Sequence, residues 1–436
     1  MLTAILMIGL FLCGIALMIT RKLPVLITLP ILAVGVAVIA GVPLIEGGGE
    51  KDTGILTYII QGGATRLATA YSAVILGAWL GQFMNQTEIS KTIVKGAAEL
   101  GGDNPFLITI LITTAVAMLY TSINGLGAAI MIGSIAVPIM VSVGVSGVTA
   151  VCMMLFGMAT GSIMNMSSWS FYTTATGVQQ SEVQSFALTL AVLTAVTSLL
   201  FATIEFRRTG VKFAWAAHAP IDSSLQVQNG KIPLLSLFTP LIPIICVIGF
   251  KCPILPAFLA GIAWCFLTIY LFSSKKMEEL ISILTKSALE GISDSAPAVL
   301  LMIGIGMVLN SFMHPIVIQN IKPFLQLVVP SEPITYIALF SLLVPFALYR
   351  GPLNLWGLGS GIASVIISLN ILPAPAVFSA FLSAERVQFI GDPTNTHNVW
   401  LANFVGIDVN KILFKVLPYI WGLAITGITI SSFMWL

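Results

Sequence analysis

The sequence contains one internal repeat, and its two copies cover most of the chain. Gly161-Ser-Ile-Met-Asn165 recurs 230 residues later as Gly391-Asp-Pro-Thr-Asn395. The matching positions are 161–165 and 391–395, 124 and 354, 127 and 357, and, two residues off this spacing, 55–57 and 283–285. Because the spacing exceeds half of the 436 residues, the chain reads as two consecutive copies of one unit. In an apolar chain, polar and glycine-broken stretches at matching places are typical of transporters built from two repeats.

The composition requires lipid as the solvent. Hydrophobic residues make up 57% of the chain and charged residues only 8%, against about 25% charged in a soluble domain. Several apolar runs are long enough to cross a bilayer; they lie at 2–19, 24–45, 233–250, 253–273 and 413–436. We therefore expect a multi-pass protein of the inner (plasma) membrane with the bilayer as a partner. The net charge of +2 gives no reason to expect nucleic acid.

Basic residues in short loops predict the orientation of the two copies. Such residues collect on the cytoplasmic side, and the candidates are Arg21-Lys22, Arg207-Arg208 with Lys212, and Lys275-Lys276. If all three are cytoplasmic, the first run ends inside whereas its equivalent at 233–250 begins inside. The copies are then inverted. The predicted units are a first repeat at 1–206, a cytoplasmic linker at 207–231 that carries His218, Asp222 and Gln226, and a second repeat at 232–436.

Each half has two polar interruptions in its apolar runs. They lie at 121–127 and 161–168 in the first half, and at 350–357 and 391–398 in the second. A single stretch of this kind is usually a loop between complete spans. Four stretches in two matched pairs instead indicate helices that break inside the membrane, where Asn, Ser and Thr satisfy the exposed backbone groups. Half-helix N-termini facing such gaps favour an anionic ligand.

Charged residues lie near the breaks of the second half only. Arg350 opens one break, Glu385 and Arg386 precede the other, and Asp392 lies inside it. An ionised group at membrane depth costs about 2.5–3.5 kcal/mol, so each needs a partner or a function. One hypothesis is a structural network in which Glu385, Arg386 and Asp392 neutralise one another. The other is that Arg350 or Arg386 binds a substrate carboxylate while Asp392 takes a cation or proton.

Other residues with possible chemistry have weaker signals. His397 could be protonated with substrate, although a lone histidine is more often a hydrogen-bonding residue. Arg66 and Asp294 are equivalent, with Glu290 one turn before Asp294, and we expect them on amphipathic helices at the membrane face. The cysteines show neither metal nor pairing spacing and read as small buried hydrophobes; they are Cys13, Cys152, Cys246, Cys252 and Cys265.

Enzyme motifs are weak or absent in the sequence. Gly144-Val-Ser-Gly147 fits the Gly-x-Ser-Gly pattern of rhomboid-type intramembrane proteases, but no histidine lies in a neighbouring span of the same half. There is no phosphate loop, nucleotide fingerprint or zinc motif. We therefore expect a protein that is not an enzyme and needs no cofactor, with Na⁺ as a possible coupling ion.

The breaks resemble those of the ion transporter superfamily. Ser122-Ile-Asn124 followed by Ile130–Pro138 resembles the Ser-Asn-Thr hairpin tip and apolar helix of divalent anion/sodium symporters. Gly391-Asp-Pro-Thr-Asn395 resembles their Gly-Thr-Pro-Pro-Asn loop. The arrangement is also similar to gluconate permeases and to the large membrane subunit of TRAP transporters. This sequence departs from the family pattern in the residue order of the first tip, and in Arg350 and Pro352 of the second.

The resemblance implies an all-α polytopic membrane protein with two inverted-topology repeats, each with a re-entrant hairpin and a broken helix, and about 10–12 membrane segments. It places the hairpin tips at Ser122–Gly125 and Arg350–Asn354, and the broken-helix loops at Gly161–Ser168 and Gly391–Asn398. It also implies a homodimer that works by an elevator-type alternating-access mechanism.

The resulting hypothesis is a secondary active symporter, coupled to H⁺ or Na⁺, for small organic anions such as gluconate-like sugar acids, citrate or C4-dicarboxylates. The candidate substrate-binding residues are Ser122, Asn124, Asn165, Ser167, Arg350, Asn354, Arg386, Thr394, Asn395 and Thr396. The candidate coupling residues are Asp392, His397 and Glu385. A cation/proton antiporter of the same superfamily is the alternative, and an intramembrane serine protease with Ser146 as nucleophile is a distant one.

Overall fold

The computed structural model describes residues 2–20, 22–47, 53–210, 232–273, 275–330 and 332–436, and over these residues the chain is helical and contains no strand. The first half contains α1 (Leu2–Ile19), α2 (Val25–Ala40), η2 (Ile55–Gly62), α3 (Gly63–Arg66), α4 (Ala68–Gln86), α5 (Ile89–Leu100), α6 (Pro105–Tyr120), α7 (Leu126–Ser142), α8 (Gly147–Ile163), α9 (Met166–Thr176) and α10 (Gln180–Thr209). The second half contains η4 (Leu234–Leu241), α11 (Ile242–Ile244), η5 (Ile245–Gly249), α12 (Ile254–Phe272), α13 (Met277–Met313), α14 (Pro315–Val328), α15 (Pro333–Leu343), η6 (Val344–Arg350), α16 (Gly359–Ser368), α17 (Ala374–Gly391), α18 (Thr396–Phe404) and α19 (Val409–Trp435).

The order of elements in the first half is repeated in the second. A hairpin of two helices (α6 and α7, then α15–η6 and α16) is followed in each half by a helix that breaks (α8 and α9, then α17 and α18) and by one long helix (α10, then α19). Among the described residues, six helices are long and apolar enough to cross a membrane, and the pair α8–α9, bent by 59°, makes a seventh candidate. The predicted all-α polytopic fold with paired hairpins and broken helices is confirmed.

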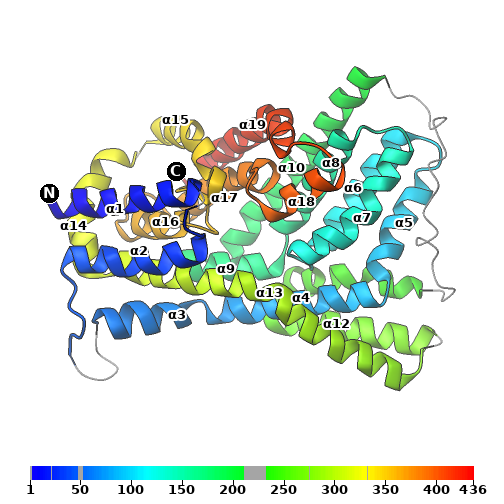
Figure 1. Cartoon of the computed structure of the whole chain (residues 1–436), viewed down its shortest axis with the longest axis horizontal. Helices are drawn as coiled ribbons and strands as arrows, with labels where there is room; N and C mark the ends of the chain where they lie inside the picture. The colour runs from blue at the N-terminus through cyan, green and yellow to red at the C-terminus, as the bar shows by residue number, and fades with distance from the viewer. Residues whose placement is uncertain (1, 21, 48–52, 211–231, 274, 331) are drawn as a thin grey trace.

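Equivalent long helices pack antiparallel, which shows that the two halves are inverted. The α3–α4 helix and α13 lie side by side along the length of the molecule (Figure 1). Gly63 of α3 lies against Met307 of α13, whereas Trp79 of α4 lies against Gly291. Residue numbers therefore increase along one helix in the direction in which they decrease along the other. This is expected when two copies are related by an axis perpendicular to both helices.

The last helices of the two halves show the same relationship. Phe201 of α10 packs edge-to-face on Tyr419 of α19, with 5.1 Å between ring centroids. Glu205, further along α10, pairs with Lys415, which comes earlier in α19, at 2.6 Å between Oε2 and Nζ. Both pairs of equivalent helices thus support the inversion that the basic residues predicted.

Close packing brings the first hairpin onto the first broken helix. Asn104 caps α6 by accepting hydrogen bonds from the backbone N–H groups of Phe106 and Leu107. Farther along, α6 crosses α8 so closely that a side chain on Gly161 would overlap the carbonyl oxygen of Ala117. Only glycine permits this approach. The end of α6 and the break after α8 are therefore held next to each other.

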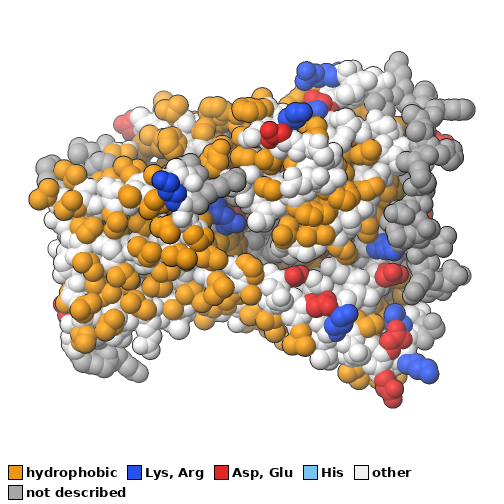
Figure 2. All heavy atoms as spheres, in the orientation of Figure 1, with side chains coloured by type: hydrophobic (Ala, Val, Ile, Leu, Met, Phe, Trp, Pro, Cys, Tyr) orange, Lys and Arg blue, Asp and Glu red, His pale blue; other side chains and the backbone are white. Residues whose placement is uncertain are grey.

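The surface divides into an apolar expanse and a charged end. Figure 2 shows hydrophobic side chains across most of the visible face, with most of the charged side chains in its right-hand half, from the end of α10 down to α13 and α12. Arg66 and Asp294 lie in helices that are long enough to cross a membrane, and their interfacial location stays a prediction. Residues 211–231 of the linker, with His218, Asp222 and Gln226, lie outside the described residues.

Candidate functional site

A ring of hydrogen bonds joins the first hairpin tip to the first helix break. Asn124 at the tip donates from Nδ2 to Ser167 Oγ at 3.0 Å. Ser167 Oγ donates to Asn165 Oδ1 at 2.5 Å. Asn165 Nδ2 in turn donates to the backbone carbonyl of Tyr120, at the end of α6, at 3.1 Å. The side-chain amide of Asn165 therefore serves both the start of α9 and the end of the hairpin's first helix.

The same tip is bound to the start of the second half. Thr121 and Ser122 both donate from their hydroxyls to the carbonyl of Pro240 in η4, at 2.9 and 2.5 Å. This carbonyl is available because Pro243, three residues later, has no N–H to donate to it. The tip residue Ser122 is fully buried. Its hydroxyl thus holds the hairpin in place, whatever else it binds.

The second hairpin tip is longer and more strained than the first. Tyr349 and Arg350 have positive φ angles of 57° and 53°, which side chains other than glycine rarely adopt. Asp392, in the second helix break, accepts a hydrogen bond at Oδ2 from the backbone N–H of Tyr349 at 2.6 Å. Its Oδ1 accepts from the backbone N–H and the hydroxyl of Thr394 at 2.8 and 2.6 Å. Asp392 therefore ties the tip to the break with both oxygens.

Two buried amides at the second site have unused hydrogen-bonding atoms. Asn354 Oδ1 accepts from the backbone N–H of Trp356 at 2.7 Å, but its Nδ2 has no partner among the described residues. Asn398 Nδ2 donates to the carbonyl of Asp392 at 2.9 Å, but its Oδ1 has no partner in the same part of the chain. Both residues are fully buried. A buried amide atom without a partner costs about 1–3 kcal/mol, so these atoms are suited to a ligand.

The predicted residues Asn395 and His397 turn back onto the helix before the break. Asn395 Nδ2 donates to the carbonyls of Gln388 and Phe389 at 3.3 and 3.4 Å. His397 Nε2 lies 3.2 Å from the same carbonyl of Phe389. Thr396, between them, is exposed. Asn395 and His397 thus satisfy the free carbonyls at the end of α17.

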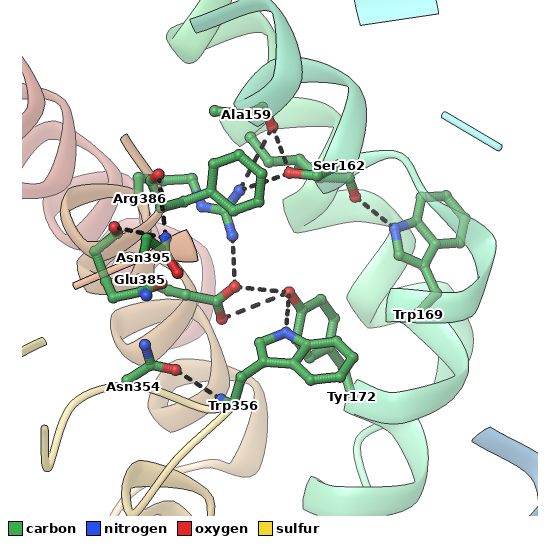
Figure 3. Close-up of polar contacts among 12 residues, drawn as sticks. Ala159, Ser162, Trp169, Tyr172, Asn354, Trp356, Glu385, Arg386 and Asn395 are labelled. Atoms are coloured by element: carbon green, nitrogen blue, oxygen red, sulfur yellow. Dashed lines mark hydrogen bonds and ion pairs between the residues drawn. The ribbon is translucent and has the colours of Figure 1, made fainter. Parts of the chain in front are cut away.

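A buried network joins the two halves (Figure 3). Arg386 Nη2 lies 2.7 Å from Glu385 Oε1, and both side chains are at most 3% exposed. Arg386 Nη1 reaches Ser162 Oγ of α8 at 3.3 Å. On the other side, Glu385 accepts a hydrogen bond from the hydroxyl of Tyr172 in α9 at 3.1 Å. The pair in α17 therefore holds both parts of the first broken helix.

Aromatic stacking extends this network to the second hairpin tip. The ring of Trp356 stacks on Phe171 of α9, with centroids 4.1 Å apart and planes 22° apart. Trp356 Nε1 also lies 3.5 Å from the hydroxyl of Tyr172 (Figure 3). The second tip is thus packed against the first broken helix. The four breaks of the two halves form one connected unit.

A cavity of about 370 Å³ opens beside this unit. Tyr349, Arg350, Thr394 and Val399 line one side, and Met18 with 23–25, at the junction of α1 and α2, lines the other. Figure 2 shows the surface hollowed in the middle of the visible face. Arg350 Nη1 donates a hydrogen bond of 3.3 Å to the carbonyl of Trp356. Within the described part of the chain, most of the guanidinium's five donors therefore stay free to bind a ligand.

The structure thus sorts the predicted residues into three places. Ser122, Asn124, Asn165 and Ser167 meet at the first tip; Arg350, Asn354, Asp392, Thr394, Asn395 and His397 meet at the second; Glu385 and Arg386 lie between the halves. Thr396 turns away from these groups. Their roles in binding and coupling stay predictions. In the part of the chain that the structure describes, no three His, Cys, Asp or Glu side chains converge as metal ligands would.

Sequence reasoning missed several residues. Tyr172, Trp356 and Ser162 contact the buried pair, and aromatic residues beside the predicted breaks were the available signal. The sequence named Asp294 of α13 but did not predict its contact with the first hairpin. Its carboxylate lies beside Gly127 in the first turn of α7 and accepts a hydrogen bond from Gln82 at 2.5 Å. A carboxylate at a helix N-terminus is favourable, and the N-cap residue of α7, Gly125, has no side chain to cap it.

Comparisons with known proteins agree with a transporter fold. No protein-family model and no curated protein matches the sequence. The YdaH transporter of Alcanivorax borkumensis, described as having an unusual topology, is similar in structure, with a TM-score of 0.62 and 13% identity over 97% of this chain and 98% of that one. Neisseria gonorrhoeae MtrF, described as illuminating a class of antimetabolite efflux pumps, gives a TM-score of 0.57 and 13% identity over 97% and 95%. The chain therefore has the fold of multi-pass membrane transporters.

Proposed function

We propose that this protein is a secondary active transporter of small organic anions, most simply carboxylates. The observation that carries the proposal is Arg350, which lines a cavity at a strained hairpin tip and uses one of its donors on the Trp356 carbonyl. A guanidinium presents a planar fork that matches a carboxylate in two places. Thr394, an uncharged residue that lines the same cavity, suits another polar group of such a substrate.

The two candidate arginines have different surroundings. Arg350 faces a cavity, whereas Arg386 is buried in a pair with Glu385 and reaches across to α8. A substrate would meet Arg350 without breaking an existing ion pair. We therefore assign the anion-binding role to Arg350 and a positioning role to Arg386. Glu385, which holds Arg386, is then a poorer candidate for coupling than the sequence suggests.

The coupling ion and the movement are part of the same proposal. The four connected breaks would move as one body against α1, α2, α12 and α13, as in an elevator-type mechanism, in a homodimer of the inner membrane. The carboxylates and the backbone carbonyls of the breaks are the groups that would bind the coupling ion, whether that ion is H⁺ or Na⁺. Both oxygens of Asp392 already accept hydrogen bonds from the tip and the break, so coupling through Asp392 would release the second tip. Binding of the coupling ion would then be linked to release of the second hairpin tip.

Transport in proteoliposomes tests the proposal. The assay follows uptake of labelled gluconate, citrate and succinate under separate H⁺ and Na⁺ gradients. We expect saturable transport of at least one anion, and a rise in KM of roughly tenfold or more in Arg350→Ala because a charged hydrogen bond is worth about 1.5–3 kcal/mol. Lys322→Ala, which removes an exposed basic residue from α14, is the matched control and should behave like the unaltered protein.

Two other outcomes would redirect the assignment. Na⁺-driven proton movement with no organic anion present would favour the cation/proton antiporter. Faster exit than entry of the same anion would indicate export, the direction that the description of MtrF suggests. Ser146, the nucleophile of the protease hypothesis, caps α8 by accepting from the backbone N–H of Thr149 at 3.3 Å. This gives Ser146 a structural role instead.

A further inference from the structure

Two of the five cysteines lie together at one turn. Cys246 is in η5, and Cys252 is in the turn that leads into α12. The backbone N–H of Cys252 donates to the carbonyl of Cys246 at 3.0 Å. Both side chains are partly exposed, whereas Cys152 and Cys265 are buried. The spacing of six residues gave no reason to pair them, so the contact depends on how the helix ends.

The helix ends in a geometry that brings the two cysteine residues together. Phe250 N–H also donates to the Cys246 carbonyl, at 3.2 Å, and Lys251 between the bonded residues has a φ of 54°. This is a Schellman-like C-terminus, with a left-handed residue followed by a return bond to an earlier turn. In that motif the side chains of the two bonded residues usually contact each other.

The backbone separation also suits a disulfide. A hydrogen bond from the N–H of one residue to the carbonyl of another places their Cα atoms about 6 Å apart, and disulfides span about 4.4–6.8 Å. Both cysteine residues of the turn are partly exposed, as an exchange reaction with an external oxidant requires. Phe250 and Lys251, which lie between the two cysteines in the turn, are exposed and leave room for the bond.

The position along the chain favours an oxidising compartment. The turn joins two apolar segments, Leu234–Gly249 and Ile254–Phe272. Lys275 and Lys276 follow the far end of the second segment, and clustered basic residues indicate the cytoplasmic side. The cysteine turn then lies at the outer side of the membrane, where disulfides form and persist.

We propose that Cys246 and Cys252 form a reversible disulfide that fastens the end of η5 to the start of α12 at the outer membrane face. The oxidant is a disulfide, either a small one such as oxidised glutathione or that of a protein thiol oxidase. One cysteine thiolate attacks the oxidant and releases its first thiol; the second cysteine thiolate then attacks the mixed disulfide and releases the second thiol. The protein loses two electrons and two protons, and one oxidant disulfide becomes two thiols.

Trypsin provides a direct test because it cleaves after Lys251, between the two cysteines. The purified protein is incubated with oxidised glutathione or with reductant, alkylated, digested and analysed by mass spectrometry. We expect the peptides 232–251 and 252–275 to stay linked after oxidation and to separate after reduction. The second peptide also carries Cys265, so the link should survive in Cys265→Ser and be lost in Cys246→Ser and Cys252→Ser.

Two results would overturn the proposal. If Cys246 and Cys252 are both recovered alkylated after oxidation, or if the link depends on Cys265, the pair does not form. Alkylation of the protein in intact cells, without reductant, tests whether the cysteine turn lies on the outer side of the membrane. Linked peptides in this sample support the outer face, and fully alkylated cysteines contradict it. None of these measurements depends on transport, so the pairing stands or falls separately from the proposed function.

Discussion

Arg386 pairs with Glu385, its immediate neighbour in the chain, at 2.7 Å between Nη2 and Oε1. Successive residues on a helix normally point in different directions, so this contact requires both side chains to bend toward each other. They do so in a site where each is almost completely buried. Ser162 on α8 and Tyr172 on α9 add hydrogen bonds to Arg386 and Glu385, respectively. The Glu385–Arg386 pair therefore connects the two halves.

Removing one residue of the Glu385–Arg386 pair should destabilise the protein strongly. Glu385→Gln leaves the Arg386 charge buried without its counter-charge, and a broken buried pair costs about 3–5 kcal/mol. Replacing both residues, Glu385→Leu with Arg386→Met, should cost much less. The equivalent positions of the first half are Leu155 and Phe156, so an apolar pair is tolerated there. Thermal unfolding in detergent measures the difference; a double variant no more stable than Glu385→Gln would contradict a paired role.

Asn165 should be needed for its two separate hydrogen-bonding functions. Asn165→Ala loses the cap of α9 and the bonds to the hairpin tip, and a lost cap costs about 0.5–2 kcal/mol. Asn165→Asp keeps the acceptor for Ser167 but places a carboxylate oxygen against the Tyr120 and Ile123 carbonyls. We expect both variants to lose transport, with Asn165→Asp the less stable of the two by thermal unfolding, because an unpaired buried carboxylate costs more than a lost cap.

Ser146 provides the control for this experiment. Ser146→Ala removes the cap of α8 at the end far from the break. It should lose about 1 kcal/mol of stability and keep transport. Equal loss of transport in Ser146→Ala and Asn165→Asp would mean that general loosening, and not the tip contact, explains the effect.

Gly127 and Asp294 should show a reciprocal dependence. A methyl group at Gly127 would lie 2.6 Å from Asp294 Oδ2, so Gly127→Ala should displace the carboxylate and lower transport. Shortening the partner, as Asp294→Ser does, makes room for the methyl group. We expect the double variant to recover at least part of the activity that Gly127→Ala loses, relative to Asp294→Ser alone. Purely additive losses in transport rate would show that the two residues do not act together.

Two glycine substitutions should change stability in opposite directions. Gly161→Ala would press a methyl group into the backbone of α6 at Ala117, which cannot move aside. We expect a loss of about 1–3 kcal/mol, the usual range for overpacking. Gly96 lies in α5, where a methyl group would meet no described atom within 4 Å, so Gly96→Ala should stabilise by about 0.5–1 kcal/mol. Thermal unfolding of both variants and the parent measures the two shifts.

The sequence predicted the elements well because membrane depth restricts what polar residues can do. Asn124, Asn165, Asn354 and Asn395 each stand at a break, as expected where backbone groups lose their helical partners. The repeated spacing then indicated which breaks correspond. The inverted relationship followed from a few basic residues, and antiparallel packing of equivalent helices confirms it. These are local or pairwise features, which a sequence carries directly.

Contacts that depend on where helices cross one another in space were not predictable from the sequence. Asp294 contacts Gly127 only because α13 crosses the first hairpin at that height. The contact of Tyr172 with Glu385 joins helices from opposite halves, and no spacing along the chain encodes it. The second tip differs from the first because Pro352 and the two left-handed residues Tyr349 and Arg350 delay the start of α16. The Cys246–Cys252 contact likewise needs the particular path of one turn.

The antiparallel arrangement of α4 and α13 has a consequence for the transport cycle. The two halves are the same architecture viewed from opposite faces of the bilayer, yet here they differ in detail, since the cavity with Arg350 borders the second tip. If each half adopted the conformation of the other, access to the cavity would change to the opposite side of the membrane. The helices and the kinds of contact between them would stay the same. Such an exchange of shapes describes the opposite-facing state that a carrier must visit, and the conformation of one half provides a template for the other.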